Sequence, residues 1–124
     1  MQVFKNKSFD RWAKKEGLGD DVLRQAVIEM ARGLVDAELG GQIYKKRIAV
    51  PGRGKRGGIR TLLVYRAGSR AFFVYGFAKN QRANVSADEL KALKLLAKEL
   101  LGMTKAELTQ AIEHGALVEI TLNV

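Results

Sequence analysis

The chain has 124 residues, of which 22 are lysine or arginine and 13 are aspartate or glutamate, giving a net charge of +9. This length predicts a single domain over residues 1–124, with one modest core. The absence of cysteine excludes a disulfide framework and a thiolate zinc site. No stretch is apolar enough for a signal peptide or for the ~20-residue span of a membrane, so we expect a cytosolic protein.

The first third of the chain predicts two helices. Residues 2–5 favour a short strand, and Ser8 is the expected N-cap of a helix that runs to about residue 16. Asp20 or Asp21 then caps a second helix, and Gly33 is its expected C′ residue. Its apolar stripe repeats at spacings of three and four residues: Val22, Leu23, Ala26, Val27, Met30 and Ala31.

The middle of the chain predicts strands. Residues 43–50, 59–66 and 71–78 are rich in β-branched, aliphatic and aromatic residues. The four-residue turn at 67–70 predicts an antiparallel hairpin between the last two. The glycine-rich segment "PGRGKRGG" joins the first of these strands to the second.

The last third returns to helical spacing. Ser86 with Glu89, and Thr104 with Glu107, form capping-box patterns for helices that end near residues 101 and 114. Residues 117–124 alternate, with Val118, Ile120, Leu122 and Val124 on one face, as in a half-buried edge strand. The predicted fold is α+β: a small antiparallel sheet with two N-terminal helices and C-terminal helices packed on it.

The charges are segregated along the chain. All thirteen acidic residues lie outside residues 39–87. That segment holds eleven cations: Lys45, Lys46, Arg47, Arg53, Lys55, Arg56, Arg60, Arg66, Arg70, Lys79 and Arg82. A field of one sign attracts polyanions, although a basic face that only keeps the protein soluble is the simpler alternative.

Few residues suit other kinds of chemistry. His114 follows a predicted helix, where an imidazole favours the helix dipole, and no local spacing of carboxylates predicts a metal site or a cofactor. "GRGKRGG" is not a nucleotide-binding P-loop, because no serine or threonine follows its lysine and a strand comes next. Its glycines allow close approach to a phosphate, and a plain flexible loop is the alternative.

The predicted hairpin gathers the cations. Antiparallel pairing places the end of strand 71–78 beside the start of strand 59–66, so Arg60 meets the Lys79–Arg82 segment. Such a cluster either binds an acidic partner or acts on RNA, which supplies its own 2′-hydroxyl nucleophile. Arginines neutralise phosphate charge, and a lysine among cations loses its proton more readily, which makes Lys55 or Lys79 the candidate base.

The motifs "GGIRT" and "YGFAKNQRAN" complete a resemblance over residues 1–101. The chain resembles the RelE/HigB superfamily of bacterial type II toxins. The resemblance implies mRNA cleavage, commonly on the ribosome, and a cognate antitoxin that is encoded next to the toxin. It aligns Arg60 with the family's strand arginine, Arg53 or Lys55 with its loop cations, and Lys79 or Arg82 with its next basic position. Many relatives carry a tyrosine or histidine near the last helix, where this chain has "NVSADE", so the general acid stays unassigned.

The leading hypothesis is therefore an mRNA endoribonuclease toxin that uses no metal. Its predicted catalytic residues are Lys55, Arg60, Lys79 and Arg82. Its predicted RNA-binding residues are Lys45, Lys46, Arg47, Arg53 and Arg56. Two alternatives are a non-catalytic RNA- or ribosome-binding module with the same basic surface, and a ParE-like toxin that inhibits DNA gyrase.

Overall fold

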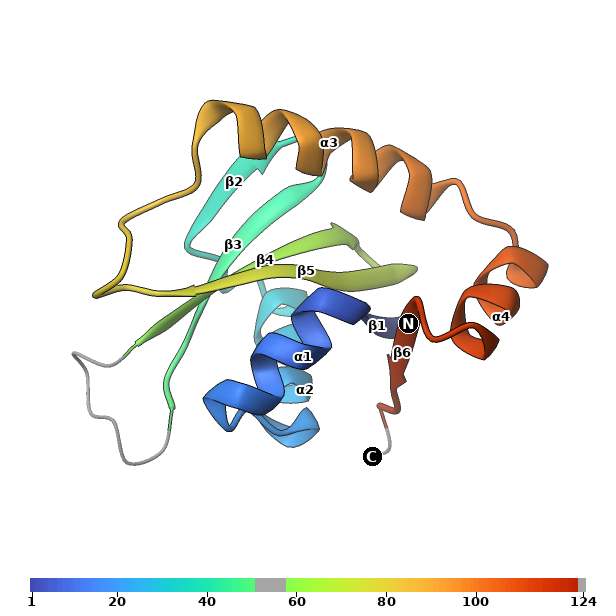
Figure 1. Cartoon of the computed structure of the whole chain (residues 1–124), viewed down its shortest axis with the longest axis horizontal. Coiled ribbons are helices and arrows are strands. Elements are labelled where there is room, and N and C mark those ends of the chain that lie inside the picture. The colour runs from blue at the N-terminus through green and yellow to red at the C-terminus, as the bar shows by residue number, and fades with distance from the viewer. Residues whose placement is uncertain (51–57, 123–124) are drawn as a thin grey trace.

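A computed structural model describes residues 1–50 and 58–122 of the chain. Over these residues the chain forms four helices and six strands, in an α+β fold (Figure 1). In chain order they are β1 (Gln2–Asn6), α1 (Lys7–Glu16), α2 (Asp20–Ala31), β2 (Ala37–Gly40), β3 (Ile43–Ile48), β4 (Ile59–Arg66), β5 (Arg70–Ala78), α3 (Ala87–Leu101), α4 (Lys105–Glu113) and β6 (Leu117–Ile120). None of these helices is long and apolar enough to cross a membrane.

The strands form one sheet in the order β2-β3-β4-β5-β1-β6. The predicted hairpin is confirmed, because β4 pairs antiparallel with β5 from Ile59 opposite Ala78 to Arg66 opposite Arg70. The sheet is mostly antiparallel, as predicted, with one parallel pair, because β1 lies parallel to β5. Strand β2 was not predicted. It is four residues long, and its "AELG" sequence lacks the β-branched and aromatic residues that indicate strands.

Helices cover both faces of the sheet. In Figure 1, α1 and α2 lie below the sheet and α3 lies above it, while α4 lies beside β6 at one end. The core is correspondingly divided into two layers. The layer under α1 and α2 contains Phe9, Leu23 and Phe73, and the layer under α3 contains Leu62 and Phe72.

Helix ends follow the capping rules, with one correction. Both predicted capping boxes are present, at Ser86 with Glu89 and at Thr104 with Glu107. The first helix begins two residues earlier than predicted: the side chain of Asn6, not Ser8, accepts a hydrogen bond from the backbone N–H of Phe9 at 2.8 Å. Asn6 ends β1, so the strand passes directly into the helix.

Strand β6 is an edge strand, as predicted, but it buries both faces. Leu117 packs in the layer under α3 and Ile120 in the layer under α1 and α2. The predicted single buried face over 117–124 is therefore wrong. The strand ends at Ile120, and residues 123–124 lie outside the described part of the chain.

A β-bulge in β5 resets the alternation of its side chains. Leu63 lies opposite Phe73 and Leu62 lies opposite Tyr75, so Val74 is the extra residue. Beyond the bulge, Tyr75 lies on the same face as Leu62, and Phe77 lies opposite Arg60. Two aromatic side chains thus reach the α3 face at the end of the sheet where the cations gather.

Candidate nucleic-acid interface

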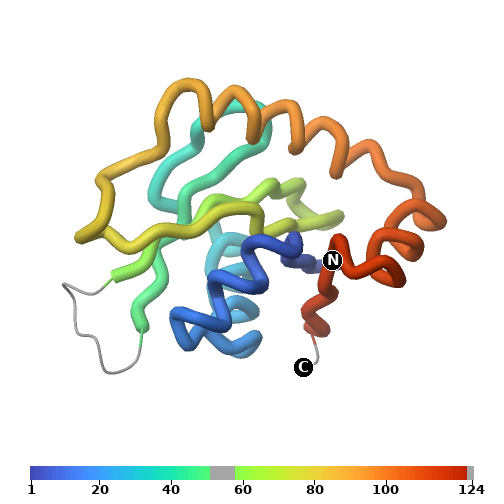
Figure 2. The backbone as a smooth tube through the Cα atoms, viewed as in Figure 1, coloured from blue at the N-terminus to red at the C-terminus, as the bar shows by residue number. Residues whose placement is uncertain are grey.

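A basic cleft lies at the end of the sheet that α3 leaves uncovered. It has a volume of about 420 Å³. Its lining residues are Asp36, Ala37, Lys45, Arg47, Arg60, Lys79 and Ala83. They come from β2 and the residue before it, from β3, from β4 and from the segment between β5 and α3. That segment crosses from the end of β5 to the start of α3 at the left of Figure 2.

Strand pairing explains why these cations meet. Arg47 lies directly opposite Arg60 across β3 and β4, and Lys45 lies opposite Leu62 on the same face. The backbone N–H of Lys79 donates to the carbonyl of Gly58 at 3.3 Å, which holds the residue after β5 beside the start of β4. The expectation that the hairpin brings Arg60 and Lys79 to one end of the sheet is confirmed.

Asp36 is the one carboxylate that lines this cleft among the described residues. Its side chain accepts a hydrogen bond from the backbone N–H of Arg47, and its own N–H donates to the carbonyl of Lys45 at 3.0 Å. Asp36 thereby extends the pairing with β3 by one residue before β2 begins. The cleft retains an excess of positive charge, because four cations face this one acid.

Lys46 lies on the opposite face of the sheet. Its ammonium contacts the Glu29 carboxylate of α2 at 2.8 Å and its side chain is 9% exposed. This ion pair holds the pKa of Glu29 below its ordinary value. Alternation along β3 separates Lys46 from Lys45 and Arg47, so the predicted RNA-binding row divides between two faces.

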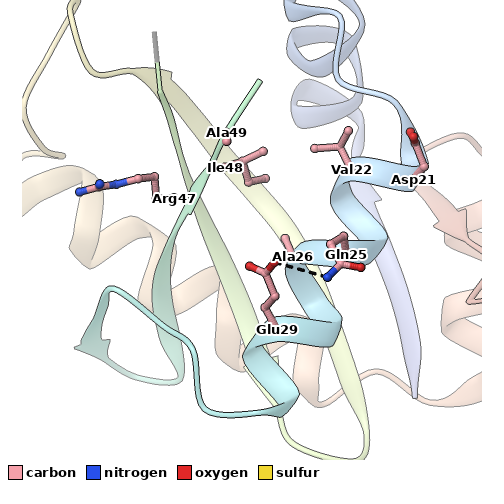
Figure 3. Close-up of a pocket in the computed structure, with 8 residues that line it drawn as sticks. All are labelled: Asp21, Val22, Gln25, Ala26, Glu29, Arg47, Ile48 and Ala49. Atoms are coloured by element: carbon pink, nitrogen blue, oxygen red, sulfur yellow. Dashed lines mark hydrogen bonds between the residues drawn. The ribbon is translucent and has the colours of Figure 1, made fainter. Parts of the chain in front are cut away.

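Figure 3 shows a second concavity, of about 490 Å³, between α2 and the end of β3. Ile48 and Val22 extend toward each other there, whereas the Arg47 side chain points away from α2. Glu29 accepts a hydrogen bond from Gln25 at 3.4 Å within the same helix. Arg47 lines both concavities, but this one also carries the Asp21 and Glu29 carboxylates of α2.

Arg82 lies beside the basic cleft but is turned toward α3. Its guanidinium forms a two-pronged ion pair with Glu89, with N–O distances of 2.5 and 3.0 Å. It also donates to the Tyr75 hydroxyl at 2.9 Å and to the Asn84 carbonyl at 2.9 Å. The Arg82 guanidinium, together with the backbone N–H of Ser86, lowers the pKa of Glu89 to about 2. The same ion pair raises the pKa of Arg82 above its ordinary value.

Three predicted site residues, Arg53, Lys55 and Arg56, lie in residues 51–57, outside the described part of the chain. His114 is the C-cap of α4, as predicted, and does not line the cleft. Among residues 1–50 and 58–122, no three histidine, aspartate or glutamate side chains come together as metal ligands.

Sequence reasoning missed three residues at this end of the sheet. Asp36 precedes a strand that was not predicted. Glu89 was assigned only to its capping box, although its second carboxylate oxygen is free to reach an arginine in the preceding segment. Tyr75 gave no signal in the sequence, because regular alternation does not reveal the bulge that places it next to Arg82.

The comparison with known families is consistent with this fold. No curated protein matches the chain significantly. The model of one family, described as the RelE toxin of the RelE/RelB toxin–antitoxin system, matches residues 1–120. The match takes in all ten helices and strands of the described chain. The chain therefore belongs to the RelE toxin family, the toxin component of type II toxin–antitoxin systems whose partner is a RelB-type antitoxin.

Proposed function

We propose that this RelE-family toxin is an endoribonuclease that cleaves mRNA on the ribosome and that its antitoxin holds it in check. One observation carries the proposal: a single basic cleft is lined by three cations of the paired strands β3 and β4 and by Lys79 of the turn after β5. Within it, Arg47 and Arg60 lie directly opposite each other. Two arginines placed side by side repel, and a polyanion relieves that repulsion.

The chemistry we propose needs no metal ion, because RNA carries its nucleophile. The 2′-oxygen attacks the neighbouring phosphorus, the bond from phosphorus to the 5′-oxygen breaks, and a cyclic phosphate remains. The 2′-hydroxyl proton passes to a base, and the leaving 5′-oxygen receives a proton from an acid. The protein must therefore position the phosphate, neutralise its developing charge and transfer protons.

The residues of the cleft divide these roles. Arg60, held on the central strand β4, is the proposed ligand of the phosphate at which cleavage occurs, because a rigid guanidinium is suited to a developing charge. Lys45 and Arg47 bind the flanking phosphates. Lys79, exposed on the turn after β5, is the proposed proton carrier. Roles for Arg53, Lys55 and Arg56 stay predictions from the sequence.

Induced expression in growing cells tests the proposal. We expect wild-type toxin to arrest growth and to produce transcripts cut within codons, and we expect Arg60→Ala and Lys79→Ala to do neither. Arg66→Ala is the matched control, because Arg66 lies on the same strand but at its other end. If both cleft variants still arrest growth, the catalytic assignment is wrong.

Purified components separate the rival functions. Cleavage of mRNA only when ribosomes are present supports action on the ribosome, whereas cleavage of free RNA supports an endoribonuclease without that dependence. RNA binding without any cleavage identifies a non-catalytic binding module. Inhibition of DNA gyrase supercoiling with transcripts left intact identifies a ParE-like toxin.

A further inference from the structure

The contacts of Arg82 occupy nearly the whole edge of its guanidinium. A guanidinium has five N–H donors in one plane. In Arg82, Nε donates to Asn84, Nη1 donates to both Tyr75 and Glu89, and Nη2 donates to Glu89. A phosphate that approached along this plane would have to displace the Glu89 carboxylate.

The charge of Arg82 is also already balanced. Glu89 contacts both terminal nitrogens, and its Oε1, which accepts from Nη2, also accepts a hydrogen bond from the Ser86 N–H at 2.9 Å. The pair therefore presents little net charge to a phosphate. This distinguishes Arg82 from Arg60 and Lys79, for which no ion pair is present among the described residues.

Two aromatic rings lie against Arg82. The guanidinium carbon is 5.9 Å from the centre of the Tyr75 ring and 5.8 Å from that of Phe77, both within cation–π range. About a third of the side chain, 33%, is exposed. Since four of its five N–H donors are already bonded, the guanidinium offers a base its flat surface and not its edge.

This group adjoins the basic cleft. Phe77 lies opposite Arg60 across β4 and β5, and the cleft-lining residues Lys79 and Ala83 flank Arg82 in the chain. A nucleotide whose phosphate lies in the cleft therefore carries its base within reach of Arg82. Proteins that bind single-stranded RNA commonly stack its bases on aromatic rings and on guanidinium planes.

We propose that Arg82, fixed by Glu89 against Tyr75 and Phe77, is a stacking surface for an unpaired base of the bound RNA, and that it is not a ligand of the phosphate. The inference rests on the proposed function, because it assumes that RNA occupies the basic cleft. It replaces the catalytic role predicted for Arg82 with a role in holding and selecting a base.

Binding of a single-stranded 2′-O-methyl RNA, which lacks the nucleophile, tests the inference without cleavage. Each protein is titrated at several salt concentrations, and its fold is checked by circular dichroism. Arg82→Lys keeps the positive charge but replaces the planar guanidinium with an ammonium group that cannot stack. The double variant Arg82→Gln with Glu89→Gln removes both charges together, so its net charge equals that of the wild type. Lys79→Gln probes a phosphate contact, and Lys15→Gln, exposed on α1 across the sheet, is the control for net charge.

We expect Arg82→Lys and the double variant to weaken binding about tenfold, as loss of one stacked base does, without changing the salt dependence. Lys79→Gln should lower the slope of log K against log salt by about 0.7, the value for one phosphate on a single strand. An abasic nucleotide at one position should weaken wild-type binding about as much as Arg82→Lys does, and should not weaken that variant further.

The outcomes distinguish the inference from the proposed function. The stacking role is wrong if Arg82→Lys binds RNA like the wild type, or if no abasic position removes the difference in affinity between the two proteins. In that case, a smaller slope of log K against log salt for Lys79→Gln still supports RNA in the cleft. If the wild type shows no salt-dependent binding of this RNA, the stacking role is wrong, while cleavage of mRNA in the presence of ribosomes still decides the proposed function.

Discussion

Arg47 and Arg60 lie directly opposite each other across β3 and β4, with Lys79 lining the same cleft. Like charges in this position destabilise a sheet. A second such pair, Arg66 opposite Arg70, lies at the other end of β4 and β5, about 20 Å away at ~3.3 Å per residue. The two pairs allow the cost of charge repulsion to be separated from a role in function.

The first prediction concerns Arg60. Replacing Arg60 by glutamine should leave the free energy of unfolding unchanged or raise it by up to about 0.5 kcal/mol, because repulsion with Arg47 is relieved. The same variant should lose RNA binding and growth arrest. Arg66→Gln should have the same small effect on stability and keep activity. Urea denaturation and growth assays measure both effects, and a strongly destabilised Arg60→Gln would contradict the prediction.

The second prediction concerns the pH dependence of the pair of Glu89 with Arg82. The pKa of Glu89 falls from 4.5 to about 2 in the folded protein, so folding favours its ionised form. Its stabilising contribution is therefore complete above pH 4.5 and is lost as the pH falls toward 2. Glutamine preserves the capping box but not the ion pair. The difference in Tm between wild type and Glu89→Gln should shrink as the pH falls through this window, and a constant difference would refute the ion-pair explanation.

The third prediction concerns Lys5, a buried cation on β1. Its ammonium contacts Asp10 of α1 and Asp20 of α2, each at 2.8 Å. Burial disfavours the charged amine, but the two carboxylates outweigh burial and raise the pKa of Lys5 above its ordinary value. Lys5→Met should lower the free energy of unfolding by about 2–3 kcal/mol, because Asp10 loses its buried partner.

Lys14 provides the control for Lys5. It also contacts Asp10, at 3.1 Å, but its side chain is 76% exposed. Lys14→Met should therefore lower the free energy of unfolding by less than about 0.5 kcal/mol. Urea denaturation measures the free energy of unfolding of both variants. If Lys5→Met and Lys14→Met lowered it equally, the ion pairs of Lys5 with Asp10 and Asp20 would not be what connects α1 and α2 to β1.

The fourth prediction concerns Gly76 in β5. A Cβ atom at this position would lie 2.1 Å from the Trp12 ring of α1, so only glycine admits the indole against the strand. Gly76→Ala should lower the free energy of unfolding by about 1–3 kcal/mol through overpacking, and should change the tryptophan fluorescence. In a double-mutant cycle with Trp12→Leu, the cost of Gly76→Ala should largely disappear. Additive losses would rule out this contact as the cause.

Local patterns in the sequence determined much of this fold. The capping boxes at Ser86 and Thr104 and the hairpin of β4 with β5 depend on neighbouring residues, and all are present. The predicted apolar stripe of α2 is buried at four of its six residues: Leu23, Ala26, Val27 and Met30. The hairpin alone was enough to place Arg60 beside Lys79, because antiparallel pairing leaves no other arrangement of the strand ends. The acid-free segment similarly predicted the excess of positive charge in the cleft.

Contacts between distant residues decided the rest. The parallel pairing of β1 with β5 joins residues far apart in the chain, and no local pattern encodes such a partner. The bulge at Val74 placed Tyr75 and Phe77 on the α3 face of the sheet, whereas regular alternation would place them on the other face. In the sequence, Lys46 and Arg82 cannot be distinguished from the neighbouring cations. In the structure, each is neutralised by a carboxylate: Lys46 by Glu29 and Arg82 by Glu89. A sequence states which charges a chain carries, whereas packing decides which of them are already neutralised.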